Sequence, residues 1–304
     1  MKKYDKKFLV LITNTLSELD VLFPLFAGMK KEYNVKVEML ITVSKIHAQY
    51  ESNDFYKYCA KELNIKINKC QLPNKFDYRE GIFIKKPVIL LINLYFIILK
   101  IIKFPYLIPK LILSNAFMHE YSNQIGSTYI LYLYKRYFSK KIYTYIHGQS
   151  FNQVGKNSRK VQHAEKSLLL LWHENNRPLV NSLGYSNIHL IGMTKFFSEW
   201  IYYINEYSKL AFYKKIVLIY TRSPKHKFYM DKNIYSELLL TSYRAIRAKL
   251  SDITIVLKLH PREDKNFAES LIRTKNLKNI LISNEHAGVL AKNALFVISF
   301  WTSA

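Results

Sequence analysis

Histidine, arginine and hydroxyl side chains follow several apolar segments of the sequence, at the points where those segments end. The clearest case is Ile253–Leu259, an apolar, β-branched run that predicts a buried strand. His260, Pro261 and Arg262 come directly after it. Pro261 has no backbone N–H and holds His260 extended, so we expect the strand to end there. An imidazole and a guanidinium at a strand end suit an anion such as a phosphate, although a capped strand and a solvated loop would explain the same residues.

Two other predicted strands in the second half of the chain end in side chains of the same kind. These strands are Ile216–Tyr220 and Leu295–Ser299. The side chains after them that suit an anion are Arg222, Ser223, Thr302 and Ser303. Ligands in open α/β sheets bind outside the carboxyl ends of the strands. We therefore expect these side chains to gather with His260 at one edge of a sheet.

The first half of the chain has similar strand ends. Lys141–Ile146 predicts a strand. The residues that follow it are His147, Gly148 and Gln149. A glycine at this position lets a ligand approach the backbone closely. The buried strand expected at Ser167–Trp172 leads to Glu174. His147 and Glu174 are the candidate acid–base groups of this half, although a histidine that only completes a turn would also explain His147.

Strands alternate with helices along the whole sequence, which predicts an α/β fold with parallel sheets. The first strand is expected at Phe8–Thr13, without a glycine-rich phosphate loop after it. Ser17, with Asp20 three residues later, predicts the capping box of the following helix. A polar loop is expected at residues 44–53.

The 304 residues are enough for two βα domains, which we place at 1–205 and 206–304. The aromatic segment Phe196–Tyr213 is expected to connect them as a helix. Only about 90 residues follow Ile216, which is short for a complete domain. The second domain is therefore expected to be truncated at its C-terminal end.

The chain is strongly basic, with 46 Lys and Arg against 22 Asp and Glu and a net charge of +24. Such an excess attracts nucleic acid, an anionic membrane surface or phosphorylated substrates. The basic residues are scattered and no nucleic-acid-binding motif is present, so no specific nucleic-acid partner is expected. The apolar run Pro87–Leu99 is shorter than the about 20 residues of a membrane span. It predicts a buried helix or, alternatively, a helix lying in a membrane surface.

From about residue 143 onward, the sequence resembles glycosyltransferases of the GT-B architecture. It is similar to the clan whose second domain carries a His-Pro motif, here His260-Pro261, and later a hydroxyl pair, here Thr302-Ser303 in place of the usual two serines. This clan includes bacterial sialyltransferases and polysialyltransferases, Kdo transferases and CDP-glycerol glycerophosphotransferases. The resemblance implies two Rossmann-like domains that face each other across a cleft. It also implies that the histidine and the hydroxyl pair bind the phosphate of a nucleotide donor.

Two further segments carry the resemblance. His147-Gly148 is similar to the His-Gly of the glycerophosphotransferases, which lies near the acceptor. Residues 221–223, Thr-Arg-Ser, are similar to the first loop of the family's donor domain. The acidic general base of the sialyltransferases has no matching motif, so the resemblance assigns no base.

The chemistry of these residues suits such a reaction. A CMP- or CDP-linked donor carries its leaving group as a phosphate, on which negative charge builds as the glycosidic bond breaks. Removing one hydrogen-bond donor that is fixed at such a site typically raises the activation barrier by about 2.7–4 kcal/mol. No Asp-x-Asp pair stands at a strand end, so neither a metal nor another cofactor is expected. The acceptor hydroxyl needs a base, for which His147 is the first candidate and Glu174 the second.

The leading hypothesis is a metal-independent glycosyltransferase that uses a CMP- or CDP-activated sialic acid or Kdo-like sugar. Its acceptor would be a glycan or glycolipid in the synthesis of bacterial surface polysaccharide, capsule or lipopolysaccharide. It would work in the cytoplasm or on the inner face of the membrane. One alternative is transfer of glycerol phosphate from CDP-glycerol. A second is a non-catalytic basic protein that binds lipid or nucleic acid, whose affinity would fall steeply with salt.

Overall fold

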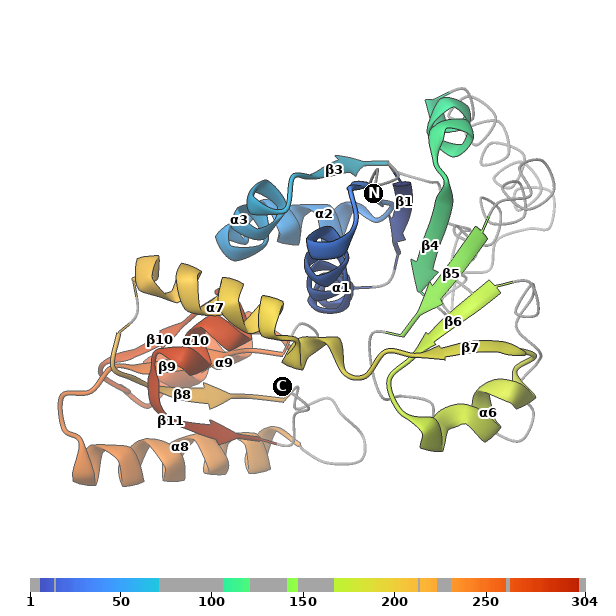
Figure 1. The fold of residues 1–304 in the computed structure, drawn as a ribbon. Helices are drawn as coiled ribbons and strands as arrows, with labels where there is room; N and C mark the ends of the chain where they lie inside the picture. The colour runs from blue at the N-terminus through green and yellow to red at the C-terminus, as the bar shows by residue number, and fades with distance from the viewer. Residues whose placement is uncertain are drawn as a thin grey trace, which may run out of the picture. The chain divides into compact units, whose positions relative to one another are not determined.

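The computed structural model describes residues 6–13, 15–70, 106–120, 141–146, 167–212, 214–222, 231–260 and 263–300. The chain forms two compact units (Figure 1). Unit 1 comprises Met1–Glu51 and Lys57–Ile201, and unit 2 comprises Ser52–Tyr56 and Tyr202–Ala304. Each unit is built on one parallel sheet, which confirms the predicted α/β fold class.

Unit 1 contains a seven-stranded sheet in the order β3-β2-β1-β4-β5-β6-β7, and neighbouring strands are parallel throughout. Its strands are β1 (Lys6–Ile12), β2 (Val35–Ile41), β3 (Ile65–Lys69), β4 (Ala116–Glu120), β5 (Lys141–Tyr145), β6 (Ser167–Leu171) and β7 (Asn187–Leu190). The helices along this part of the chain are α1 (Leu19–Glu32), α2 (Ser44–Glu51), α3 (Asp54–Glu62), α6 (Arg177–Ser182) and α7 (Ser198–Leu210). The start of α3 and most of α7 belong to unit 2. The strand order reverses between β1 and β4, so the carboxyl ends of these strands form the switch point where α/β sheets bind ligands.

The central strands of unit 1 are buried on both faces, as is usual for a parallel sheet. Leu9 and Leu11 of β1 share a cluster with Leu107 from the helical residues 106–113. Phe8 points to the opposite face, where its ring meets Phe26 of α1 edge-on with the centroids 5.6 Å apart. Successive side chains of β1 therefore pack against two different layers.

Two local predictions differ from the structure. Residues 44–53 were expected as a polar loop, but α2 occupies Ser44–Glu51. Ile46 and Tyr50 lie four residues apart on one face of α2 and are buried, so tertiary contact determines this helix despite its polar composition. The strands β3 and β4 were not expected. β3 has only Ile65 fully buried, and β4 buries polar side chains, so neither gives a clear apolar pattern.

Unit 2 contains a four-stranded parallel sheet in the order β10-β9-β8-β11. Its elements are β8 (Ile216–Tyr220), α8 (Lys232–Lys249), β9 (Ile255–Lys258), α9 (Lys265–Thr274), β10 (Ile280–Ile282), α10 (Ala287–Lys292) and β11 (Ala294–Ser299). The strands predicted at Ile216–Tyr220, Ile253–Leu259 and Leu295–Ser299 correspond to β8, β9 and β11. The central strands β8 and β9 are apolar and buried, as is typical of strands covered on both faces, whereas the edge strand β11 is mostly exposed.

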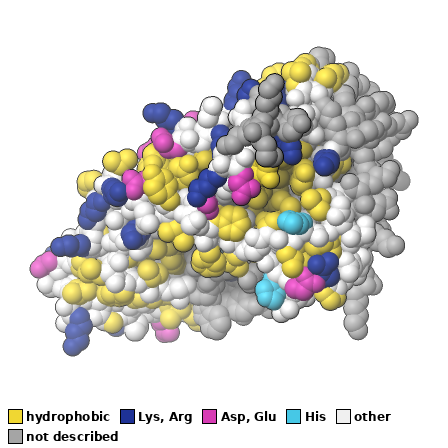
Figure 2. All heavy atoms as spheres, in the orientation of Figure 1, with side chains coloured by type: hydrophobic (Ala, Val, Ile, Leu, Met, Phe, Trp, Pro, Cys, Tyr) yellow, Lys and Arg dark blue, Asp and Glu magenta, His cyan; other side chains and the backbone are white. Residues whose placement is uncertain are grey.

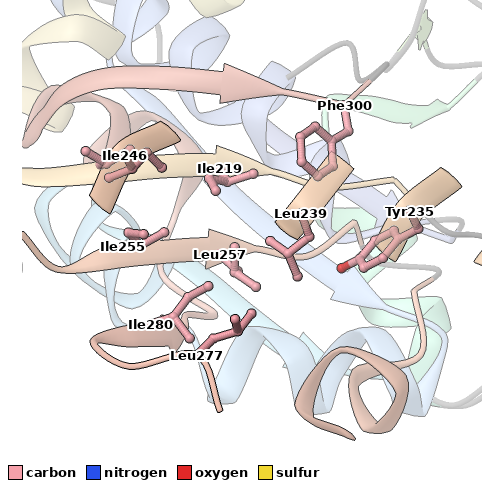
Figure 3. Packing of buried hydrophobic residues seen from close by; sticks show 10 residues of the cluster. Ile219, Tyr235, Leu239, Ile246, Ile255, Leu257, Leu277, Ile280 and Phe300 are labelled. Carbon is pink, nitrogen blue, oxygen red and sulfur yellow. The ribbon is translucent and has the colours of Figure 1, made fainter. Parts of the chain in front are cut away.

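Helices cover both faces of this sheet. On one face, Ile219 and Leu257 pack against Tyr235 and Leu239 of α8 (Figure 3), with side chains of α9 at the margin of the same cluster. On the other face, Leu218 and its neighbours pack against α10. Burying one such aliphatic side chain contributes about 1.5–3 kcal/mol, so the core holds the strand ends at fixed positions.

Tyr220, the last residue of β8, ties the sheet to α10. Its hydroxyl donates a hydrogen bond of 2.7 Å to the carbonyl oxygen of Ala287. Burial raises the pKa of Tyr220 to about 12. An unfolded chain loses a tyrosine proton near pH 10, so the folded state keeps it over a wider range. The stability that Tyr220 contributes is therefore fully present below about pH 10 and is lost as the pH rises from about 10 to 12.

We expect Tyr220→Phe to lower the free energy of unfolding by about 1 kcal/mol at neutral pH, because one hydrogen bond is lost. We also expect the variant to lose less stability than the wild type above about pH 10. Urea denaturation at neutral and alkaline pH measures both effects. Tyr202→Phe is the control, since Tyr202 is exposed. Identical alkaline slopes for wild type and Tyr220→Phe would contradict this account.

The charged side chains show no single basic patch on the face drawn in Figure 2, where Lys and Arg are scattered among acidic and apolar groups. Within the described ranges, no helix is long and apolar enough to cross a membrane. The run Pro87–Leu99 lies outside the described residues, so its predicted helix stays a prediction.

Candidate functional site

Unit 2 joins the carboxyl ends of β8 and β9, which are adjacent strands. Thr221 follows β8 and is buried, and its backbone N–H donates to the carbonyl oxygen of Lys258 at 3.2 Å. His260 follows β9, and its backbone N–H donates to Oε2 of Glu263 at 3.1 Å. The Thr221 hydroxyl donates to the same carboxylate oxygen at 2.7 Å. One oxygen atom therefore holds both strand ends together.

The loop between β9 and α9 is fixed at both ends. The backbone N–H of Glu263 donates to the carbonyl oxygen of His260 at 2.8 Å. The Asp264 side chain accepts from the backbone N–H of Asn266 at 3.1 Å and caps α9. Such a cap satisfies one of the free N–H groups at the helix start. Hydrogen bonds within the chain thus hold His260 and the start of α9.

Arg222 is partly buried and directly follows Thr221, so its backbone stands beside the joined strand ends. The other residues predicted to bind the donor phosphate lie outside the described residues: Ser223, Pro261, Arg262, Thr302 and Ser303. Through Glu263, the structure therefore holds the strand end that leads to Arg222 next to the strand end that carries His260. Their role in binding a phosphate stays a prediction.

In unit 1, a buried carboxylate lies at the switch point. Glu18, at the end of the short 3₁₀ turn Leu16–Glu18, is fully buried. Its Oε1 accepts the backbone N–H groups of Thr13 at 3.2 Å and Thr15 at 3.0 Å. Its Oε2 accepts the hydroxyl of Tyr145, the last residue of β5. Glu18 therefore links the loop after β1 to the end of β5.

The Tyr145 phenol stays protonated in this setting. Burial raises its pKa well above the usual value, and the negative charges of Glu18 and, to a smaller extent, Glu120 raise it further. A neutral phenol can donate a hydrogen bond but cannot act as a base near neutral pH. Tyr145 is therefore a fixed donor to Glu18 at the edge of the sheet.

His119 of β4 is buried beside this edge and has partners at both ring nitrogens. Its Nδ1 lies 2.7 Å from the carbonyl oxygen of Glu120, which can only accept, so Nδ1 carries a proton. Its Nε2 lies 3.2 Å from the hydroxyl oxygen of Thr144, which donates to it when the ring is neutral. These contacts fix the ring, so His119 serves as a structural link between β4 and β5.

Of the two predicted acid–base candidates, His147 and Glu174, the structure describes only Glu174. His147, Gly148 and Gln149 lie outside the described residues, although the chain reaches Ile146 at the end of β5. Glu174 follows β6 and is exposed, with a bidentate contact to Arg177 in which Nη2 donates to Oε2 at 3.0 Å. The hydrogen bond from Arg177 lowers the pKa of Glu174. A carboxylate of lowered pKa is a weaker base, so His147 keeps first place.

Sequence reasoning missed Glu18 and Glu263, which hold the two sheet edges. The capping box is formed by Thr15 and Glu18 and not by the predicted Ser17 and Asp20. Both pairs have the spacing of this motif, but Glu is its usual acidic residue, and this could have identified the correct pair. Glu263 gave no signal, because an acidic residue after a His-Pro pair looks like an ordinary solvated loop.

No family model matches the sequence, and no curated protein matches it. Solved structures match along nearly the whole chain. UDP-GlcNAc 2-epimerase from Neisseria meningitidis, bound to UDP-GlcNAc, has 14% identity and a TM-score of 0.52, covering 96% of this chain and 77% of that one. A proposed UDP-N-acetylglucosamine 2-epimerase from Listeria monocytogenes has 11% identity and a TM-score of 0.56, with coverage of 97% and 74%.

An Arabidopsis thaliana UGT complexed with UDP gives a comparable match, with 11% identity and a TM-score of 0.51 over 98% of this chain and 76% of that one. Identities this low establish the fold alone. The chain therefore has a GT-B-like fold, with two Rossmann-like βα domains built on parallel sheets of seven and four strands.

Proposed function

We propose that the protein is a glycosyltransferase that transfers a sugar from a CMP- or CDP-activated donor to a glycan or glycolipid acceptor. The observation that carries this proposal is the pair of joined strand ends in unit 2. There, one carboxylate oxygen holds the backbone of His260 and the hydroxyl of Thr221, next to Arg222. The resemblance to the His-Pro clan supports a sialic acid or Kdo-like sugar and a role in bacterial surface polysaccharide or lipooligosaccharide synthesis.

The proposed division of labour follows from the chemistry of the transfer. When the glycosidic bond of the donor breaks, negative charge builds on the leaving phosphate. His260 and Arg222 stabilise that charge if they are held in place before the reaction, which is what a rigid strand end provides. The acceptor hydroxyl attacks as its proton is lost to a base, for which we propose His147 after β5. The donor thus belongs to unit 2 and the acceptor to unit 1.

The test begins with the nucleotide. We expect His260→Ala to weaken nucleotide binding about tenfold or more, since a lost hydrogen bond to a charged group costs about 1.5–3 kcal/mol. Calorimetric titration of wild type and variant with CMP, CDP, UDP and GDP measures the effect and identifies the preferred nucleotide. His189→Ala is the matched control, because His189 is an exposed histidine of β7.

Equal nucleotide affinity in wild type and His260→Ala would remove the central claim. His260 would then only complete the strand end. Binding that falls steeply with salt for every polyanion tested, with no preference among nucleotides, would instead favour the basic binding protein. A pocket that encloses one nucleotide should depend less on salt.

Epimerisation of a nucleotide sugar is a second candidate, because two of the matched structures are described as UDP-GlcNAc 2-epimerases. Incubation with UDP-GlcNAc alone distinguishes the two activities. An epimerase inverts the sugar at C2 without an acceptor, which NMR detects directly. A glycosyltransferase releases the nucleotide only when it transfers the sugar to an acceptor or, more slowly, to water. CDP-glycerol belongs in the same donor panel, because His147-Gly148 resembles the His-Gly of the glycerophosphotransferases.

A further inference from the structure

Glu263 lies at the centre of the hydrogen bonds that join β8 to β9. Its Oε2 accepts from the Thr221 hydroxyl at 2.7 Å and from the His260 backbone N–H at 3.1 Å. Thr221 is buried, at 1% exposure. Both donors are thereby committed to the carboxylate, so neither hydrogen is available to a ligand. Any contact of His260 with an anion must come from its imidazole ring.

The second oxygen of this carboxylate faces the core. Oε1 of Glu263 is buried and has no hydrogen-bond partner in the part of the chain that the structure describes. The hydroxyl of Tyr235, in the first turn of α8, is also buried. Figure 3 shows Tyr235 at one end of the apolar cluster, with its hydroxyl turned toward the other residues of the cluster. Burial first, and then the charge of Glu263, raise the pKa of Tyr235, which keeps it a neutral donor.

A partly buried carboxylate beside a phosphate site would repel the phosphate if it served as a ligand. Like charges at short range disfavour each other, and the effect is stronger away from water. The same carboxylate can support phosphate binding indirectly if it accepts hydrogen bonds from neighbouring groups. It then holds the two strand ends in one relative position. Second-layer groups of this kind orient the residues that touch a ligand.

We propose that Glu263 is a positioning residue of the nucleotide site, which fixes the strand end carrying His260 relative to the strand end carrying Thr221 and Arg222. This inference rests on the proposed function, because it assumes that a nucleotide phosphate binds at these strand ends. It adds a residue that neither the His-Pro motif nor the hydroxyl pair identifies. Glu263 acts through its neighbours and makes no contact with the donor.

Three variants separate positioning from charge. Glu263→Ala removes both hydrogen bonds, and we expect nucleotide affinity, measured with the best of CMP, CDP, UDP and GDP, to fall about tenfold or more. Glu263→Gln keeps an amide oxygen that accepts both bonds, so most of the affinity should remain. Glu269→Ala is the control, since Glu269 lies on α9 in an exposed pair with Lys265. The nucleotide affinity of Glu269→Ala should equal that of the wild type.

A double-variant comparison tests whether Glu263 acts through Thr221. Thr221→Val removes the hydroxyl donor and keeps the shape of the side chain. If the two residues act together, adding Thr221→Val to Glu263→Ala should cost little further affinity. Fully additive losses would show that Glu263 has another role, and the proposal would fail. The Thr221→Val variant also supplies a result if Glu263→Ala does not fold.

Amide hydrogen exchange gives a readout that needs no ligand. Exchange at His260 should be faster in Glu263→Ala and in Thr221→Val than in wild type, while strands β8 and β9 keep their protection. Faster exchange with unchanged nucleotide affinity would reduce Glu263 to a structural residue and overturn the proposal. If the wild type binds none of the four nucleotides, the proposed function fails. Exchange then decides separately whether Glu263 holds the strand ends, and unchanged exchange would refute this as well.

Discussion

Replacing His147 with alanine is expected to abolish transfer and to leave nucleotide affinity unchanged. A general base contributes about 10²- to 10⁴-fold to the rate, so the loss should be of that order. His147 follows β5 in unit 1, whereas the residues proposed to bind the nucleotide belong to unit 2. Release of nucleotide from the donor measures transfer, and calorimetry measures affinity. Added imidazole should restore part of the rate, because a small base can enter the space that the side chain leaves.

Glu174→Gln is the informative comparison for this prediction. Glu174 is exposed and engaged by Arg177, so its amide variant should transfer at nearly the wild-type rate. Loss of transfer in Glu174→Gln with normal transfer in His147→Ala would reverse the assignment of the base. Loss of nucleotide affinity in His147→Ala would contradict the division of labour between the two units.

The largest effect on stability is expected for Glu18→Ala. The substitution removes the carboxylate that accepts from the buried N–H of Thr13, the partly buried N–H of Thr15 and the buried Tyr145 hydroxyl, which keeps only a long hydrogen bond of 3.4 Å to the carbonyl oxygen of Leu11. A buried donor that loses its partner costs about 1–3 kcal/mol. The three together should lower the free energy of unfolding on the order of 3–5 kcal/mol, which is large for one substitution. Urea denaturation followed by circular dichroism measures it.

Glu32→Ala is the matched control, because Glu32 is an exposed residue at the end of α1. Its free energy of unfolding should change by less than about 0.5 kcal/mol. Tyr145→Phe, alone and combined with Glu18→Ala, tests the coupling of the pair. A double variant that is much less stable than Glu18→Ala would show that Tyr145 contributes independently of Glu18. A change in Glu18→Ala no larger than in Glu32→Ala would show that the switch point does not depend on this carboxylate.

Much of the fold could be predicted from the sequence, because apolar runs of the correct length mark buried parallel strands. Ile216–Tyr220 is fully buried, and its composition alone indicated a covered strand. Prediction failed where tertiary contact outweighs local composition. The helix α2 is polar overall and depends on burial of Ile46 and Tyr50. The strand β4 buries His119 and Glu120, which no apolar pattern reveals.

The candidate site was predictable only in part, for a different reason. His260 and Arg222 could be found because they follow recognisable strands, and parallel strands share one edge. The contact that holds them, from Glu263 to Thr221, could not be found, and neither could the contact from Glu18 to Tyr145, because the partners are distant in sequence. Glu263 reaches Thr221 across 42 residues, and Glu18 reaches Tyr145 across 127. A sequence pattern of a few residues carries no information about such contacts.

The pairing of β1 with β4 determines how early the sheet of unit 1 can form during synthesis on the ribosome. One side of β1 pairs with β2, but the other side pairs with β4, and Lys7 and Asn115 at the start of that pairing are 108 residues apart. A ribosome adds about 5–20 residues per second, so β1 waits roughly 5 to 20 s for its second neighbour. Distant parallel pairings also form slowly. A strand whose apolar residues become fully buried therefore emerges with one edge open, and that edge stays unpaired until residue 120 has left the ribosome.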